Sequence, residues 1–90
     1  MLKREVTAGT EERGDVRVTV SPCLSGRSIK IEKLPHPRFR TAILEISNQI
    51  LDEEQADYVQ VQISDFGALD FVLEARLRAA IREARRDTTC

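Results

Sequence analysis

The sequence is poor in the residues that most often build active sites and large cores. Its 90 residues include no tryptophan, one tyrosine, three phenylalanines, one histidine and two cysteines. With 41% hydrophobic residues, the interior of this single small domain must be mainly aliphatic. No apolar run is long enough to span a membrane, and residues 1–6 lack the apolar centre of a signal peptide. We therefore expect a cytoplasmic protein without a membrane partner.

Histidine and cysteine are too scarce to support catalysis or metal binding. His36 lies between two prolines with no adjacent nucleophile, so a structural role beside a helix is favoured. Cys23 and Cys90 lack the spacing of a metal site, and free thiols are favoured over a disulfide between them. The Glu11-Glu12 pair is typical of a solvated turn. The sequence predicts no metal site and no catalytic residue.

Charge is balanced along the chain, with a formal net charge of −1, so no overall basic field exists to attract nucleic acid. Gly9 and Gly14 do not follow a strand at the spacing of a nucleotide-binding motif. Arg78, Arg82 and Arg85 share one side of a C-terminal helical pattern. We expect these arginines to stabilise the negative end of the helix dipole. This role is favoured over binding an acidic partner or a phosphate, and nucleic-acid binding is the weakest alternative.

Alternation of apolar and polar residues predicts three strands. Val16–Val20 alternates and ends near Pro22, and alternation resumes in Ser28–Glu32. We expect these two segments to pair as an antiparallel hairpin. Tyr58–Ile63 forms the third strand, which can return parallel to one hairpin strand. Residues 1–7 form either a short edge strand or an arm.

Two helices follow from apolar residues spaced three and four apart. The first extends from about Pro37 to Glu53, and the second begins after Gly67, with Asp70 in its first turn. The expected inward residues are Phe39, Ile43, Ile46 and Ile50 in the first helix, and Leu69, Val72, Leu73, Leu77, Ala80, Ile81 and Ala84 in the second. The expected outward charges of the second helix are Asp70, Glu74, Arg78, Arg82 and Arg85.

These elements predict an α+β fold for residues 1–90. It is a small two-layer sandwich of order ββαβα, with a three- to four-stranded mixed sheet, two helices on one face, and a tail at residues 86–90. The opposite sheet face is polar, and plain solvation is favoured there over a docking role. Its residues are Arg17, Thr19, Lys30, Glu32, Tyr58, Gln60 and Gln62.

Two sequence blocks resemble the acyl carrier protein, or gamma subunit, of citrate lyase. The first is Ala8-Gly9-Thr10-Glu11-Glu12-Arg13-Gly14-Asp15-Val16, which is similar to an Ala-Gly-Thr-x-x-Ser-Gly-Asp-Val segment of that family. The second is Gly67-Ala68-Leu69-Asp70, followed by Leu73 and Ala75-Arg76-Leu77. The two blocks bracket nearly the whole chain, whereas residues 22–57 match only loosely.

The resemblance implies a non-catalytic subunit of a multisubunit complex. Such a carrier holds acetyl or citryl as a thioester on a phosphoribosyl-dephospho-CoA arm, and larger transferase and lyase subunits act on it in turn. The family's loop would correspond to Gly9, Thr10, Gly14 and Asp15, and its turn and helix to Asp65, Gly67, Asp70 and Arg76. Arg13 replaces the serine that carries the arm, and a guanidinium cannot form the phosphodiester.

Three functional hypotheses are consistent with the sequence. The leading one is a carrier subunit, or a close homologue, in a citrate-lyase-like complex, with Thr10 as the nearest alternative hydroxyl for an arm. A carrier of the malonate decarboxylase type is the nearest variant. An arm-less homologue that acts as a scaffold or interaction subunit is the third, and Arg13 is the reason for it.

Overall fold

A computed structural model describes residues 2–86 of the chain. Its elements lie close to the predicted ones, with one further strand at the N-terminus. In chain order they are β1 (Val6–Ala8), β2 (Val16–Pro22), β3 (Ser28–Lys33), the 3-10 helix η1 (Pro37–Phe39), α1 (Arg40–Glu53), β4 (Val59–Asp65) and α2 (Asp70–Arg85).

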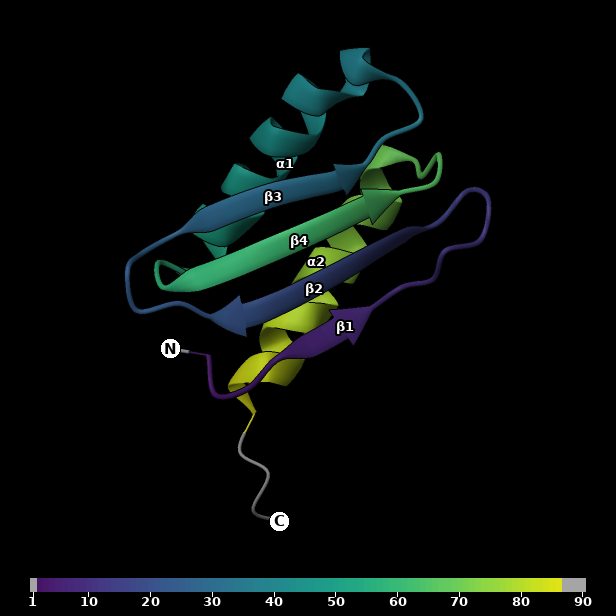
Figure 1. The fold of residues 1–90 in the computed structure, drawn as a ribbon. Helices are drawn as coiled ribbons and strands as arrows, with labels where there is room; N and C mark the ends of the chain where they lie inside the picture. The colour runs from purple at the N-terminus through teal and green to yellow at the C-terminus, as the bar shows by residue number, and fades with distance from the viewer. Residues whose placement is uncertain (1, 87–90) are drawn as a thin grey trace.

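The sheet has the order β1-β2-β4-β3, and this order corrects one prediction (Figure 1). The segments predicted to form a hairpin, β2 and β3, are not neighbours, because β4 lies between them, antiparallel to β2 and parallel to β3. Charged side chains are typical of edge strands. β3 carries Lys30, Glu32 and Lys33 and lies at the edge, whereas β4 has no charged residue before Asp65 and lies inside the sheet. The parallel return of the third predicted strand is confirmed.

The segment before β1 is not a loose arm. The Lys3 amide donates a hydrogen bond to the Ala84 carbonyl at 2.7 Å, and the Arg4 guanidinium pairs with Glu83. Leu2 is 5% exposed and lies in the core. These contacts fix the N-terminal residues on the last turns of α2, and β1 completes one edge of the sheet.

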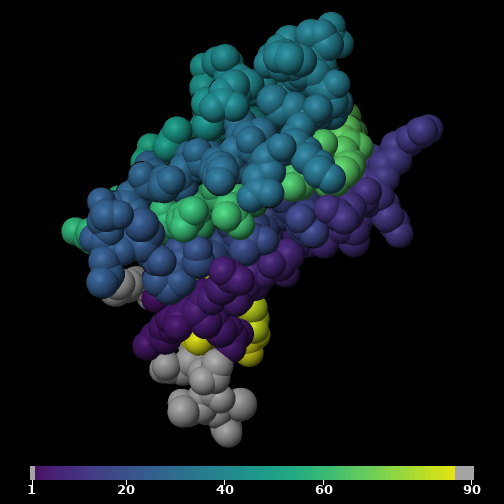
Figure 2. Space-filling model, in the orientation of Figure 1, coloured from purple at the N-terminus to yellow at the C-terminus, as the bar shows by residue number. Residues whose placement is uncertain are grey.

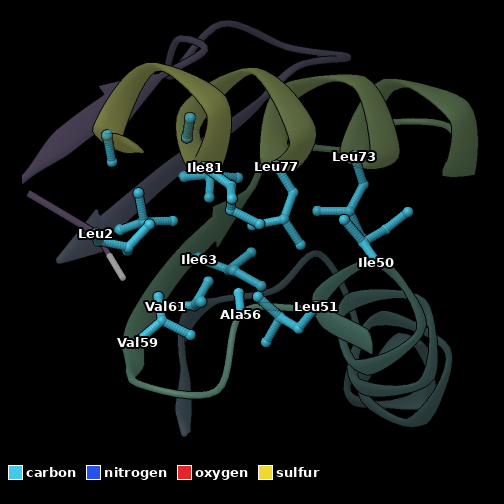
Figure 3. Close-up of a cluster of buried hydrophobic side chains, with 14 of the residues drawn as sticks. Leu2, Ile50, Leu51, Ala56, Val59, Val61, Ile63, Leu73, Leu77 and Ile81 are labelled. Carbon is cyan, nitrogen blue, oxygen red and sulfur yellow. The ribbon is translucent and has the colours of Figure 1, made fainter. Parts of the chain in front are cut away.

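Both helices cover the same face of the sheet (Figure 1), so the predicted two-layer α+β architecture is confirmed. α2 packs on β1 and β2, and α1 packs against α2 and β3. The core between the layers is aliphatic, as Figure 3 shows for Ile63, Leu77 and Ile81. All six predicted inward residues of β2 and β4 are at most 1% exposed; they are Val16, Val18, Val20, Val59, Val61 and Ile63.

The predicted inward stripes of the helices are wrong at their N-terminal ends. Phe39 is 39% exposed, because it belongs to η1 rather than to the first turn of α1. Leu69 is 63% exposed, because it is the extended N-cap residue of α2. In α1 the small polar Ser47 is buried in line with Ile43 and Ile50, and its hydroxyl has no hydrogen-bond partner within residues 2–86.

Three of the four arginines of α2, namely Arg78, Arg82 and Arg85, contact the C-terminal end of α1. Arg82 pairs with Glu54 at 3.1 Å, Arg78 at 3.4 Å and Arg85 at 3.7 Å. Hydrogen bonds from Arg82 are the main cause that lowers the pKa of Glu54. We call Glu54 with these arginines the helix clamp. An acidic partner for the arginines therefore exists within the chain itself.

Other predictions concern single residues. His36 accepts a hydrogen bond from the Arg38 amide at 3.1 Å and caps η1, as its expected structural role requires. Cys23 is a free thiol, whereas Cys90 and most of the predicted tail lie outside the described residues.

Within residues 2–86, neither helix has the length and hydropathy to cross a membrane. The same residues contain no cluster of three or more potential metal ligands.

Candidate functional site: the loop between β1 and β2

Residues 9–15 join β1 to β2 and project beyond the body of the protein at the right of Figure 2; we call them the carrier loop. The loop leaves β1 through Gly9, whose φ is +90°. A Cβ atom at this position would lie 1.8 Å from the Val16 carbonyl oxygen. Only glycine fits there, because the backbone angle and the close approach both exclude a side chain.

The far end of the carrier loop is joined to the turn that precedes α2. The Gly14 amide donates to the Phe66 carbonyl at 2.7 Å, and the Phe66 amide donates to the Asp15 carbonyl at 3.0 Å. The Asp15 amide closes a tight turn by donating to the Glu12 carbonyl at 3.0 Å. Backbone hydrogen bonds thus hold the base of the loop, whereas residues 11–13 are exposed at its tip.

Asp15 is the centre of the side-chain contacts in the loop. The Arg76 guanidinium donates from Nε to Oδ1 at 3.1 Å and from Nη2 to Oδ2 at 3.0 Å. The Thr10 hydroxyl donates to Oδ2 at 2.8 Å, and the Val16 amide donates to Oδ1 at 2.7 Å. These donors, Arg76 first, lower the pKa of Asp15 to about 2. The bidentate pair is the strongest kind of side-chain contact available here, and it fastens the loop to α2.

The second predicted group, around Gly67, forms the adjacent turn. The Asp65 carboxylate accepts hydrogen bonds from the amides of Gly67 and Ala68 at 3.1 and 2.9 Å. Gly67 has a φ of +93° and lies beside the carrier loop, since its ideal Cβ position is 3.9 Å from the Gly14 nitrogen. Asp70 is exposed in the first turn of α2. The structure therefore brings the two sequence blocks together, apart from Asp70, which lies on the outer surface.

Arg13 is exposed at the tip of the loop and has no hydrogen-bond or ion-pair partner within residues 2–86. It borders an open pocket of about 680 Å³ lined by Glu11, Arg13, Glu32, Lys33, Leu34, Pro35, Asp65 and Phe66. The Lys33 ammonium lies 5.7 Å from the centroid of the Phe66 ring in this pocket. Acidic and basic groups are mixed here, so the pocket has no clear preference for the charge of a ligand.

The loop does not fit a covalently attached phosphodiester at position 13, because Arg13 offers no hydroxyl oxygen. Thr10 is the one hydroxyl residue among residues 9–15. Its Oγ1 donates to Asp15 and also accepts from the Glu12 amide at 3.2 Å, so it is already engaged. The loop displays an exposed turn whose tip carries the Arg13 guanidinium and no hydroxyl group.

Sequence reasoning identified Asp15 and Arg76 separately and missed their contact. The two residues are 61 positions apart, and neither stands at a spacing that indicates a pair. It also missed the hydrogen bonds of Phe66 to the loop and the capping role of the Asp65 side chain. The one signal in the sequence for this role was the position of Asp65, two residues before Gly67. An aspartate there often accepts hydrogen bonds from the backbone amides of the turn that follows it.

Comparison with known proteins supports the resemblance. The family described as "ACP: Malonate decarboxylase delta subunit (MdcD)" matches residues 3–84. The citrate lyase acyl carrier protein of Serratia proteamaculans is 39% identical over 82 residues, which cover 90% of this chain and 80% of that protein. The protein of the same name from Escherichia fergusonii is 35% identical over 86 residues, which cover 94% of this chain and 89% of that protein.

A solved structure supports the fold independently. A chain in the crystal structure of a Pseudomonas malonate decarboxylase hetero-tetramer in complex with malonate superposes with a TM-score of 0.74 at 19% identity. The match covers 91% of this chain and 84% of that chain. The named relatives are acyl carrier proteins, which are non-catalytic subunits. This chain therefore belongs to the acyl carrier protein family of the citrate lyase and malonate decarboxylase type.

Proposed function

We propose that this chain is the carrier subunit, or a close homologue of it, in a citrate-lyase-like complex in the cytoplasm. It presents its carrier loop to a larger transferase subunit and a larger lyase subunit. The observation that supports this most is the contact of Arg76 with Asp15, which joins the projecting loop to α2 through two hydrogen bonds. A module that must display one turn to two partners needs this geometry and no catalytic group of its own.

An arm-less role is the second candidate, and Arg13 is the specific observation in its favour. In this form the subunit occupies the carrier's place in the complex and contributes contacts, while no acyl group is bound to it. A carrier that retains an arm through Thr10 would first have to release that hydroxyl from Asp15.

Purification of the chain from its native host tests both candidates. The proposed function expects the two larger subunits to copurify with it, and their absence would contradict it. Intact mass then separates the two forms: a loaded carrier is heavier by a phosphoribosyl-dephospho-CoA group, whereas the arm-less subunit has the mass of the bare polypeptide. Peptide mapping of residues 9–15 identifies the modified residue if an adduct is found, with Thr10→Val as the control.

A further inference from the structure

Apolar residues share the exposed side of α2 with two of the charges expected there from the sequence, Asp70 and Arg82. Phe71 is 64% exposed, and Leu69, the N-cap residue two positions before it, is 63% exposed. Ala75 and Ala79 follow Phe71 at intervals of four residues, so they lie on the same face and are exposed. We call Leu69, Phe71, Ala75 and Ala79 the α2 strip.

The small alanines leave room for a side chain from another molecule. A surface hollow of about 420 Å³ is lined by Phe71, Val72, Ala75, Arg76 and Ala79. A large aromatic residue beside two small ones is a shape into which an apolar side chain of a partner can insert. Exposure of this kind is not needed for the fold, because the buried side of α2 already supplies Leu73, Leu77 and Ile81 to the core.

The strip is continuous with the carrier loop. Arg76 lines the hollow and also donates both hydrogen bonds that hold Asp15. At the N-terminal end of α2, the turn at Gly67 approaches Gly14 of the loop. Any protein that covers the strip therefore lies next to the loop as well.

The charges beyond the C-terminal end of the strip favour carboxylates on a partner at that end. The same helix face continues from Ala79 to Arg82 and Arg86, whose side chains are 65% and 73% exposed. Arg82 uses Nε and Nη2 to contact Glu54, and Arg86 uses Nη1 to contact Glu83. Each guanidinium has five N–H donors, so donors remain for carboxylates of another chain.

We propose that the α2 strip is the docking surface for a helix of a larger subunit of the complex. That helix inserts an apolar side chain over Ala75 and Ala79 and places carboxylates against Arg82 and Arg86. A second copy of this chain suits the surface less well: residues 69–79 span about 15 Å of helix, and one such face per copy buries less than the ~800 Å² per partner of a stable interface. A larger subunit can contact the strip and the loop together.

This inference rests on the proposed function, and binding measurements separate the two. The probes are the transferase and lyase subunits of the complex from the same host, purified and immobilised separately. Phe71→Asp and Ala79→Gln should each weaken binding to one of them by about tenfold or more. Ala79→Ser, which keeps the hollow open, and Leu24→Asp, at an exposed leucine in the loop between β2 and β3, should stay within about twofold of the wild type.

The outcomes are distinct. If the wild-type chain binds neither subunit, the proposed function fails and this inference falls with it. If the wild type binds and folded Phe71→Asp and Ala79→Gln proteins bind equally well, only the docking surface is wrong. Should Phe71→Asp lower the melting temperature strongly, the Ala79→Gln and Ala79→Ser pair decides. A wild type that sediments as a dimer, with a monomeric Phe71→Asp variant, would assign the strip to a second copy and overturn the proposal.

Discussion

Two arginine and carboxylate clusters join distant parts of this chain, and they do different work. At the carrier loop one arginine, Arg76, grips one carboxylate, Asp15, through two parallel hydrogen bonds. At the helix clamp three arginines share one carboxylate, Glu54, which fixes α2 on α1. The first cluster restrains a segment that has almost no core of its own, whereas the second adds to helices that already pack through buried side chains. Similar chemistry thus sets loop conformation in one place and reinforces packing in the other.

The largest expected effect is at the base of the carrier loop. Gly9→Ala forces a methyl group against the Val16 carbonyl in a left-handed backbone conformation, and should destabilise the fold by about 2–4 kcal/mol. Gly14→Ala is the matched control, because its φ is +87° but nothing lies within 4 Å of the added Cβ. We expect about 1 kcal/mol for it. Urea unfolding of both variants measures the difference in the free energy of unfolding. Equal losses of stability would contradict the close approach of position 9 to the Val16 carbonyl.

Removal of the carboxylate of the helix clamp should have the next effect. Glu54→Gln leaves Arg78, Arg82 and Arg85 close together without their shared anion, and should cost about 1 kcal/mol, since the arginines remain partly solvated. Amide exchange in the carrier loop should not change in this variant. A faster-exchanging loop would show that the two clusters are not independent.

Unlike Glu54→Gln, Arg76→Ala should increase the mobility of the carrier loop and have little effect on the packing of the two helices. The Val16 and Thr10 amides donate to Asp15, so their exchange should quicken by about tenfold as the carboxylate loses its anchor. Arg76→Lys should restore this only in part, because lysine cannot form the bidentate pair. Unchanged exchange at both amides would show that backbone hydrogen bonds alone fix the loop.

The pair of Arg76 and Asp15 should make the stability of the carrier loop depend on pH. The pKa of Asp15 is lowered from 3.8 to about 2, so the ionised carboxylate stabilises the folded loop fully above about pH 4. This contribution is lost as the pH falls towards 2. A carboxyl NMR titration should show the pKa of Asp15 rising towards its ordinary value in Arg76→Ala. An equally low pKa in that variant would remove Arg76 as the main cause.

The smallest effect is expected at the tip of the loop. Arg13→Ser should change the free energy of unfolding by less than about 0.5 kcal/mol, because the exposed Arg13 side chain has no partner within residues 2–86. Thermal unfolding of the two proteins is the measurement. A loss beyond that limit would mean that Arg13 supports the fold and does not simply replace a functional residue.

The sequence predicts well which side of a strand is buried, and poorly which strands are neighbours in the sheet. Alternation placed Val18 and Ile63 inward because the side-chain period of a strand is fixed by its backbone. The same alternation carries no information on which strands pair, so β4 was not expected between β2 and β3. The charges of Lys30, Glu32 and Lys33 were the available indication that β3 is an edge strand.

The candidate site shows the same limit. The family-like motifs located Asp15 and Arg76, but their contact depends on how the loop folds back on α2 across 61 positions. The exposure of Phe71 was missed because three-and-four spacing defines a buried stripe without defining what lies opposite. Asp70 and Glu74 suggested a solvated charged face, and the apolar Phe71, Ala75 and Ala79 are exposed on α2 as well.

Under the proposed function, the carrier loop keeps its shape although Arg13 stands where the resemblance places the attachment serine. Treatment of the wild type and Arg13→Ser with the transferase that loads a citrate lyase carrier tests this directly, with mass spectrometry as the readout. We predict that Arg13→Ser acquires the phosphoribosyl-dephospho-CoA group at position 13 and that the wild type stays at its bare mass. Loading of the wild type, or a folded Arg13→Ser protein that remains unmodified, would contradict it.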